Sequence, residues 1–318
     1  MRALITGVGG FVGGFLAKHL IESGDEVFGT IYSGNARAYA LPLTEIKTFQ
    51  IDLSDTAKTI DLVNSIKPDV IYHLAGIAFV PEAEENFDRV LRSNVLATSN
   101  VVRAAHLLGR PTKVVFVSSA EVYGKVSPDQ IPISEGVPPQ PANNYSLTKL
   151  MSEEVVHRYA RGNTISAVIV RPFNHIGPRQ DPRFVASSFA RQVAQIKLGI
   201  VPPVMKVGNL EAKRDFSDVR DIVRAYRLSA TKGSGIYNLG VGHSCAVRLI
   251  LETLVKFVDQ KISIESDPSR MRGPEVPEIY SDCSKAFKDL GWKTEIPLER
   301  SLRDTFDFWV DFESKARS

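Results

Sequence analysis

The stretch Thr6-Gly7-Val8-Gly9-Gly10-Phe11-Val12-Gly13 decides the fold of this chain. It follows a short apolar run at residues 3–6 and opens a helix-like segment at 11–23, after which residues 26–31 are apolar again. A strand, a glycine-rich turn, a helix and a second strand form a βαβ unit. We expect Gly7 to allow the tight turn, Gly10 to let a pyrophosphate approach the backbone, and Gly13 to let the helix pack closely. The sequence therefore predicts a dinucleotide site here, with Phe11 and Val12 at the helix N-terminus that receives the phosphates.

The pattern of the opening continues along the chain. Strand-like runs lie at 69–74, 113–118 and 166–171, and helix-length segments between them at 87–108 and 146–161. This alternation predicts an α/β fold with a Rossmann-type, doubly wound parallel sheet. Prolines loosen the pattern after residue 172, so we predict a dinucleotide-binding domain over 1–171 and a smaller C-terminal α/β substrate lobe over 172–318. Residues 219–240 are expected to return to the first domain.

Composition excludes several classes of protein. The chain has 318 residues, of which 39 are basic and 36 acidic, so its net charge of +3 is too small for a dedicated nucleic-acid binder. Cys245 and Cys283 are too far apart for a disulfide framework or a zinc site, and the histidines show no metal-binding spacing. No apolar stretch reaches the roughly 18 residues of a membrane span, and no signal segment is visible. We expect a cytoplasmic protein that binds neither metal, membrane nor nucleic acid.

The end of the second strand bears on which dinucleotide is bound. Many such folds carry an acidic residue about 20 residues after the glycines, where it holds the ribose hydroxyls. Residues 29–37 contain no carboxylate. Ser33 and Asn35 can hydrogen-bond a 2′-phosphate and Arg37 can pair with it, although Arg37 is equally explained as a solvated loop residue. The sequence therefore predicts NADPH as cofactor, with NADH accepted.

Two further strand ends supply candidate cofactor contacts. Asp52 and Leu53 follow an apolar run, and the carboxylate would suit the exocyclic amine of adenine. Leu74 and Ala75 close the next strand with Gly76 after them, as expected where backbone lies against a ribose and phosphates. Taken alone, each of these segments is more often an ordinary strand end.

A tyrosine and a lysine form the candidate catalytic pair. Tyr145 and Lys149 are four residues apart at the start of an expected helix, so both side chains lie on one helical face. We expect the ammonium group to lower the pKa of the phenol and so make it a better acid/base. Ser119 ends the preceding strand at the same edge of the sheet, where its hydroxyl can hold a substrate carbonyl oxygen.

In these motifs the chain resembles the extended short-chain dehydrogenase/reductases that act on nucleotide sugars, over nearly its whole length. The resemblance rests on the opening TGxxGFxG, Asp52-Leu53, His73-Leu74-Ala75, Asn94-Val95, SSxEVYG at 118–124, YSLTK at 145–149 and RPFNHIGPRQ at 171–180. It implies that Ser119, Tyr145 and Lys149 are the catalytic set, with Tyr145 and Lys149 also beside the cofactor and Lys149 on the nicotinamide ribose. It also implies a homodimer that pairs through the helices at 87–108 and 146–161.

The same resemblance implies a set of residues that grip the nucleotide sugar. Asn174 would contact the sugar or its diphosphate, and Arg214 and Arg272 would bind the diphosphate through their guanidinium groups. Glu275 would accept hydrogen bonds from the nucleotide ribose. The alternative is that these arginines only pair with neighbouring acids.

The segment Ser119-Ala120-Glu121 bears on the reaction. The chain is most similar to the branch that uses GDP-mannose and its 4-keto-6-deoxy product, which contains 4,6-dehydratases and 4-reductases. Dehydratases carry Thr-Asp-Glu or Thr-Ser-Glu here, and Ala120 cannot donate a proton. We therefore expect NAD(P)H-dependent reduction of GDP-4-keto-6-deoxy-D-mannose to GDP-D-rhamnose, with Ser119 and Glu121 at the sugar. Alternatives are the 4,6-dehydratase, another nucleotide-sugar epimerase or reductase, the talo product, and a scaffold without activity.

Overall fold

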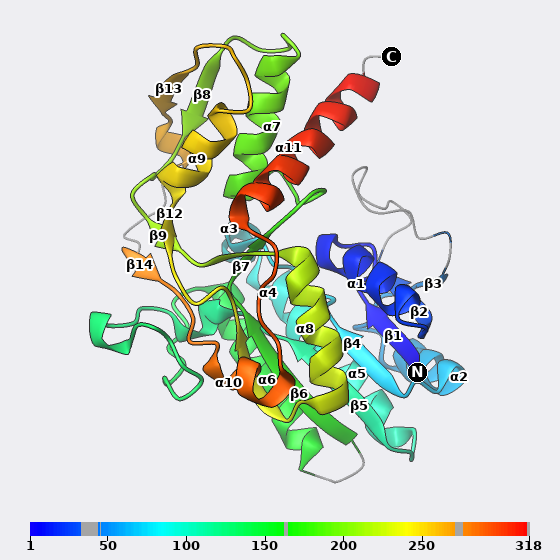
Figure 1. Ribbon diagram of the computed structural model, residues 1–318. Coiled ribbons are helices and arrows are strands. Elements are labelled where there is room, and N and C mark those ends of the chain that lie inside the picture. The colour runs from blue at the N-terminus through cyan, green and yellow to red at the C-terminus, as the bar shows by residue number, and fades with distance from the viewer. Residues whose placement is uncertain (33–43, 45, 162–164, 271–275, 317–318) are drawn as a thin grey trace.

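A parallel sheet of seven strands with helices on both faces forms the centre of the molecule (Figure 1). The computed structural model describes residues 1–32, 44, 46–161, 165–270 and 276–316. In spatial order the strands are β11 (Gly235–Leu239), β6 (Ile165–Pro172), β5 (Thr112–Val117), β4 (Val70–His73), β1 (Arg2–Thr6), β2 (Glu26–Ile31) and β3 (Lys47–Gln50). The predicted doubly wound α/β sheet is confirmed, and the predicted strands agree with β1, β2, β4, β5 and β6 to within a residue or two.

The central strands β1, β4, β5 and β6 are largely apolar because both faces of the sheet are covered there. One face carries α1 (Phe11–Glu22), α8 (Val219–Lys232) and α10 (Ser284–Leu290), and the other carries α2 (Thr56–Ile66), α5 (Ala97–Leu107) and α6 (Asn144–Ala160). Along β5, Val115 packs on the α1 side, whereas Val114 and Phe116 pack on the α5 side. Successive side chains therefore fill two separate cores.

The chain returns to the sheet after leaving it. β11 pairs in parallel with β6, Gly235 opposite Val168, and α8 lies beside α1 on the same face. Both elements fall within the return segment expected at residues 219–240. The division of the chain at residues 171 and 172 stays a prediction.

A second lobe lies beyond the carboxyl ends of the strands (Figure 1). Its helices α7 (Val185–Lys197), α9 (Val247–Val255) and α11 (Leu298–Lys315) share an apolar core that includes Phe189, Leu251, Phe306 and Trp309. Its short strands pair as β7 (Asn174–Ile176) with β10 (Phe216–Asp218), β8 (Val204–Val207) with β13 (Ser263–Ser266), and β9 (Lys213–Arg214) with both β12 (Cys245–Ala246) and β14 (Glu278–Ile279). The 3-10 turns Pro128–Gln130 and Pro268–Arg270 complete the loops.

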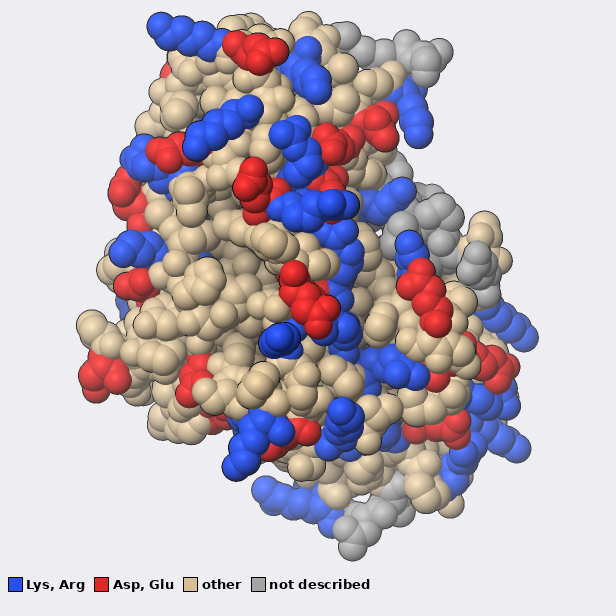
Figure 2. Space-filling model, viewed as in Figure 1, with Lys and Arg blue, Asp and Glu red and all other residues tan. Residues whose placement is uncertain are grey.

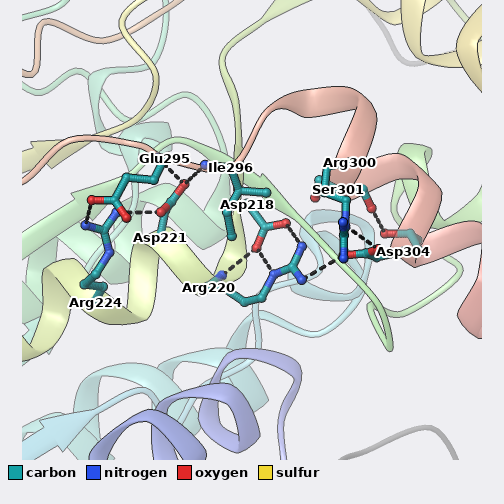
Figure 3. Close-up of polar contacts among 10 residues, drawn as sticks. Asp218, Arg220, Asp221, Arg224, Glu295, Ile296, Arg300, Ser301 and Asp304 are labelled. Atoms are coloured by element: carbon teal, nitrogen blue, oxygen red, sulfur yellow. Dashed lines mark hydrogen bonds and ion pairs between the residues drawn. The ribbon is translucent and has the colours of Figure 1, made fainter. Parts of the chain in front are cut away.

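Ion pairs tie the second lobe to the sheet layer (Figure 3). Asp218 caps α8 by accepting from the Arg220 backbone N–H at 2.8 Å and also binds the Arg220 guanidinium at 2.7 Å. The same guanidinium reaches Asp304 of α11 at 2.8 Å. In the same first turn of α8, buried Asp221 pairs with Arg224 at 2.6 Å and accepts from the backbone N–H of Glu295 at 2.9 Å. The position of α11 is therefore set partly by α8.

The helix predicted at 87–108 is interrupted. The structure has α3 (Val80–Glu85), α4 (Phe87–Val90), a π-helical turn at Leu91–Leu96, and then α5. The wider turn points Asn94 inward, where its Oδ1 accepts from the Ile77 N–H at 2.8 Å and its Nδ2 donates to Thr148 at 3.0 Å. Such π turns are frequent at functional sites. This one fixes the loop after β4 against α6.

Charged side chains of both signs are scattered over the face of the molecule shown in Figure 2. Figure 2 shows Lys and Arg interspersed with Asp and Glu on one face of the molecule. Some of these charges form ion pairs, such as Arg224 with Glu295 at 2.6 Å. Within the described part of the chain, no helix is long and apolar enough to span a membrane.

Candidate active site

The glycine turn has the geometry of a phosphate cradle. Gly7 has a φ of +76°, and a Cβ atom there would lie 2.9 Å from the Ala75 Cα. A Cβ atom on Gly13 would lie 2.5 Å from the Gly7 carbonyl oxygen. Gly10 precedes α1 with no side chain capping the helix, so N–H groups of its first turn stay available to a ligand. The turn thus fits a pyrophosphate, which a helix N-terminus binds through these groups and its dipole.

A large cleft runs from this turn across the carboxyl edge of the sheet. It has a volume of about 1780 Å³ and is lined by Gly10 and Val12 at one end, Ser119 and Tyr145 in the middle, and Arg214 beyond. Pockets for one small molecule usually measure roughly 300–1,000 Å³. The cleft therefore has room for two large ligands side by side, as an enzyme with a dinucleotide cofactor and a nucleotide sugar requires.

The walls next to the glycine turn contain the other predicted cofactor residues that the structure describes. These are Asp52, Leu53, Leu74 and Ala75, all of which line the cleft. Asp52 accepts from the Ser54 N–H at 2.9 Å, and the Ala75 N–H donates to the Thr6 hydroxyl at 3.3 Å. Ser33, Asn35 and Arg37, predicted to hold a 2′-phosphate, lie outside the described residues.

Ser119, Tyr145 and Lys149 meet in the middle of the cleft. Ser119 follows β5 and caps the 3-10 turn Ala120–Tyr123, where its Oγ accepts from the Glu121 N–H at 3.2 Å. Tyr145 and Lys149 lie in the first two turns of α6, which begins beyond Asn143 because the Asn143 side chain accepts from the Ser146 N–H at 2.8 Å. The structure therefore brings together three residues that the sequence separates by up to 30 positions.

The pKa of Tyr145 differs from what the spacing of Tyr145 and Lys149 led us to expect. The pKa of Tyr145 is raised to about 12, chiefly by burial; a hydrogen bond with Ser119 works against this rise, and the charge of Glu121 contributes to it. The expected lowering of the phenol pKa by Lys149 is therefore wrong for this protein. The Lys149 ammonium instead donates to the Val117 carbonyl oxygen at 2.8 Å and lies 6.0 Å from the centre of the Tyr145 ring. Burial lowers the pKa of Lys149 to about 8, although Glu153 raises it.

A buried ion pair supports the catalytic segment from behind. Glu153, one turn after Lys149 on α6, accepts two hydrogen bonds from the Arg171 guanidinium, at 2.9 and 2.6 Å, and one from the Ser118 hydroxyl. Arg171 also donates to the Tyr123 hydroxyl at 3.0 Å. Because all four groups are buried and paired, α6, β6 and the end of β5 are held in one arrangement.

The predicted substrate residues divide into two groups. Glu121, Asn174 and Arg214 line the cleft beyond Tyr145. The Asn143 side chain donates to Glu121 at 3.4 Å, and the Arg214 guanidinium donates to the Lys213 carbonyl oxygen at 2.8 Å. The second group, Arg272 and Glu275, lies outside the described residues.

The sequence analysis missed other residues of the cleft. Arg183 pairs with Asp181 at 2.8 Å and with Glu82 of α3 at 3.3 Å, and its guanidinium lies 4.4 Å from the centre of the Phe79 ring. Gln180 is buried beside them and ends the motif RPFNHIGPRQ. The charged run that follows this motif was the available signal. Nothing in the sequence indicated that it faces α3.

Comparisons with known proteins agree with this geometry. Residues 4–305 match the family described as GDP-mannose 4,6 dehydratase. GDP-6-deoxy-D-mannose reductase of Pseudomonas aeruginosa is 33% identical over 99% of this chain and 98% of its own length, and GDP-mannose 4,6 dehydratase of Cricetulus griseus is 28% identical over 95% and 89%. The structure of RMD from Pseudomonas aeruginosa complexed with NADPH is similar with a TM-score of 0.86 and 30% identity, covering 98% of this chain and 100% of that one. The chain therefore belongs to the GDP-mannose 4,6 dehydratase family, within the extended short-chain dehydrogenase/reductases that its motifs resemble.

Proposed function

We propose that this protein is an NADPH-dependent oxidoreductase that reduces the C4 keto group of GDP-4-keto-6-deoxy-D-mannose to give GDP-D-rhamnose. The observation that carries the proposal is the meeting of Ser119, Tyr145 and Lys149 in a cleft that starts at the glycine turn. The similarity to a GDP-6-deoxy-D-mannose reductase over nearly the whole of both chains supports the same substrate class.

The chemistry follows from the protonation states of these residues. Bound NADPH supplies the hydride that reaches C4. Tyr145 is protonated at neutral pH because its pKa is about 12, so it donates a proton to the carbonyl oxygen as negative charge develops there. The Ser119 hydroxyl donates a hydrogen bond to the same oxygen. Lys149 is charged below about pH 8, and its ammonium group is proposed to hold the nicotinamide ribose.

The glycine turn and the walls beside it are proposed to hold the cofactor. Gly7, Gly10 and Gly13 leave space for the pyrophosphate, with Phe11 and Val12 at the helix N-terminus. Asp52, Leu53, Leu74 and Ala75 form the walls toward the adenosine. A 2′-phosphate on Ser33, Asn35 and Arg37, with NADH as a weaker substitute, remains part of the proposal.

The sugar nucleotide is proposed to occupy the other half of the cleft. Glu121 and Asn174 lie next to Ser119 and would contact the sugar, and Arg214 would bind the diphosphate. Arg272 and Glu275 are carried forward from the sequence as diphosphate and ribose contacts.

One residue argues against the dehydratase as the main activity. Elimination of the C6 hydroxyl needs an acid and a base in addition to the serine and tyrosine pair. Ala120 supplies neither and packs with Val122, Ile133 and Phe173 in a small apolar cluster. Of Ala120 and Glu121, only Glu121 is among the residues that line the cleft. We therefore expect little or no dehydration of GDP-mannose.

The test uses purified protein and the 4-keto-6-deoxy sugar nucleotide with NADPH or NADH. We expect loss of reduced-cofactor absorbance, faster with NADPH, and a product whose C4 configuration by NMR is that of rhamnose. Absence of cofactor consumption would overturn the proposal, and a talo product would overturn the stereochemistry alone. GDP-mannose supplied without the keto sugar should give no 4-keto product.

A homodimer and a cytoplasmic location belong to the same proposal. α5 and α6 pack against each other and carry exposed apolar side chains, namely Leu107 on α5 and Leu147 and Met151 on α6. Such a face suits pairing with a second copy. Light scattering should report a dimer, and Leu147→Glu together with Met151→Glu should give monomers. Both cysteines are free thiols, in keeping with a reducing compartment.

A further inference from the structure

Tyr226 is a buried tyrosine whose hydroxyl has no hydrogen-bond partner among the described residues. It lies on the second turn of α8 and has no exposed surface. Buried hydroxyl groups are nearly always paired, because an unpaired donor loses its hydrogen bonds to water and gains nothing in return. Where the hydroxyl points therefore decides what it binds.

The position of α8 directs this hydroxyl toward the cleft. A Cβ atom at Gly177 would lie 2.7 Å from the Val219 side chain and 3.6 Å from that of Phe11, so α8 starts beside the start of α1. Helical side chains lean toward the N-terminus of their helix, which carries the phenol of Tyr226 toward that end. Tyr226 accordingly lines the cleft that holds Ser119 and Tyr145.

Tyr226 also lies close to the proposed proton donor. Tyr226 lines the same cleft as Tyr145 and Lys149, and the phenol of Tyr145 adds to the effect of burial in raising the pKa of Tyr226. A reductase transfers hydride and proton to the two atoms of one carbonyl group. Its nicotinamide ring must therefore lie beside Tyr145, in the part of the cleft that Tyr226 borders.

We propose that the hydroxyl of Tyr226 hydrogen-bonds the carboxamide of the bound nicotinamide and so orients the ring toward the substrate. The inference rests on the proposed use of NADPH. The carboxamide is the polar group of the nicotinamide ring and can either donate or accept. Among the other polar groups of the cofactor, the pyrophosphate is already served by the glycine turn at α1, and a contact to a ribose is tested below.

A second tyrosine offers a matched control. Tyr72 of β4 belongs to the same apolar core, is fully buried, and also has a hydroxyl without a partner among the described residues. It is not among the residues that line the cleft. Tyr72→Phe therefore makes the same chemical change as Tyr226→Phe, away from the ligand.

The experiment measures binding by calorimetry to the full-length protein and both variants. The ligands are NADPH and 2′-phospho-ADP-ribose, which keeps the pyrophosphate and both riboses but lacks the nicotinamide. We expect Tyr226→Phe to weaken NADPH binding by about three- to tenfold, the usual effect of one hydrogen bond. Binding of 2′-phospho-ADP-ribose should not change, and Tyr72→Phe should change neither affinity. Without ligand, both variants should melt no lower than the parent protein, since neither loses a hydrogen bond.

Two results would overturn the inference while leaving the proposed function intact. One is an NADPH affinity for Tyr226→Phe equal to that of the parent protein. The other is an equal loss of affinity for both ligands, which would place the contact on a ribose or phosphate. Failure of the parent protein to bind NADPH at all would overturn the proposed function and this inference together.

Discussion

The ammonium group of Lys149 donates a 2.8 Å hydrogen bond to the carbonyl oxygen of Val117, the last residue of β5. This contact fastens α6 to the strand end that continues into Ser118 and Ser119. It also holds the ammonium against the backbone rather than against the phenol of Tyr145, whose ring centre is 6.0 Å away. A change of charge at Lys149 is therefore expected to affect both the geometry and the electrostatics of the site.

Replacement of Tyr145 by phenylalanine removes the proposed proton donor. We expect kcat to fall by about 10²–10⁴-fold, the usual contribution of general acid catalysis, with NADPH affinity unchanged. Steady-state kinetics and calorimetry provide the measurements. Tyr159→Phe, on the same helix but packed against His106, serves as control and should keep full activity. Full activity in Tyr145→Phe would assign the proton to another group.

The pH profile should report the protonation of Lys149. Its pKa of about 8 lies well below that of Tyr145, about 12, so raising the pH above 8 discharges the lysine first. We expect kcat/KM to fall through this range. The free energy of unfolding should change in the opposite sense. Between about pH 8 and the ordinary lysine pKa of 10.5, Lys149 is protonated in the unfolded chain but not in the folded protein. The contribution of Lys149 to stability therefore rises with pH in this range. Loss of activity accompanied by unfolding would contradict this assignment.

Glu153→Gln tests whether the Glu153 carboxylate raises the pKa of Lys149. The Glu153 carboxylate raises the pKa of Lys149, so its removal should move the alkaline fall in kcat/KM to lower pH. Glutamine keeps hydrogen-bonding atoms for Arg171 and Ser118, and circular dichroism checks that the variant folds. Glu154→Gln, an exposed neighbour on α6, loses the same charge and should leave the profile where it is. An unmoved profile in Glu153→Gln would mean that Glu153 acts only through packing.

The ion pairs on either side of the Arg220–Asp304 contact between α8 and α11 should contribute unequally to stability (Figure 3). Asp218→Ala removes a fully buried carboxylate that caps α8 and binds Arg220, and we expect a loss of about 3 kcal/mol in the free energy of unfolding. Arg300→Ala removes only an exposed i,i+4 pair with Asp304 and should cost less than about 1 kcal/mol. Urea unfolding measures both. Equal effects would show that burial of Asp218 is not what matters.

The sheet could be predicted from the sequence because its signals are local. The glycines at 7, 10 and 13 and the apolar runs of β1, β2, β4, β5 and β6 each lie within one element. The short strand β3 is mostly exposed, and the sequence indicated it only as a strand end before Asp52, without bounds. The π turn at Leu91–Leu96 depends on contacts of Asn94 with Ile77 and Thr148, which no local pattern encodes.

The candidate site was predictable in its members but not in its electrostatics. Ser119, Tyr145 and Lys149 belong to motifs, and the structure brings them into one cleft. The pKa of Tyr145 is set by burial under several elements, which a spacing of four residues does not report. From the sequence alone, Tyr226 is indistinguishable from the other apolar residues on the buried face of an amphipathic helix. Its unpaired hydroxyl is visible only when the helix is packed.

The return of the chain to the sheet through α8 and β11 has a consequence for how such an enzyme can diverge. A chain cut after residue 171 would leave β6 as an open edge and uncover the apolar face that α8 and α10 protect. A single crossover at residue 171 therefore cannot exchange one lobe between two relatives and leave both folds complete. New sugar specificity in this architecture has to arise by substitution within the cleft or by changes in its loops, while both lobes are inherited together.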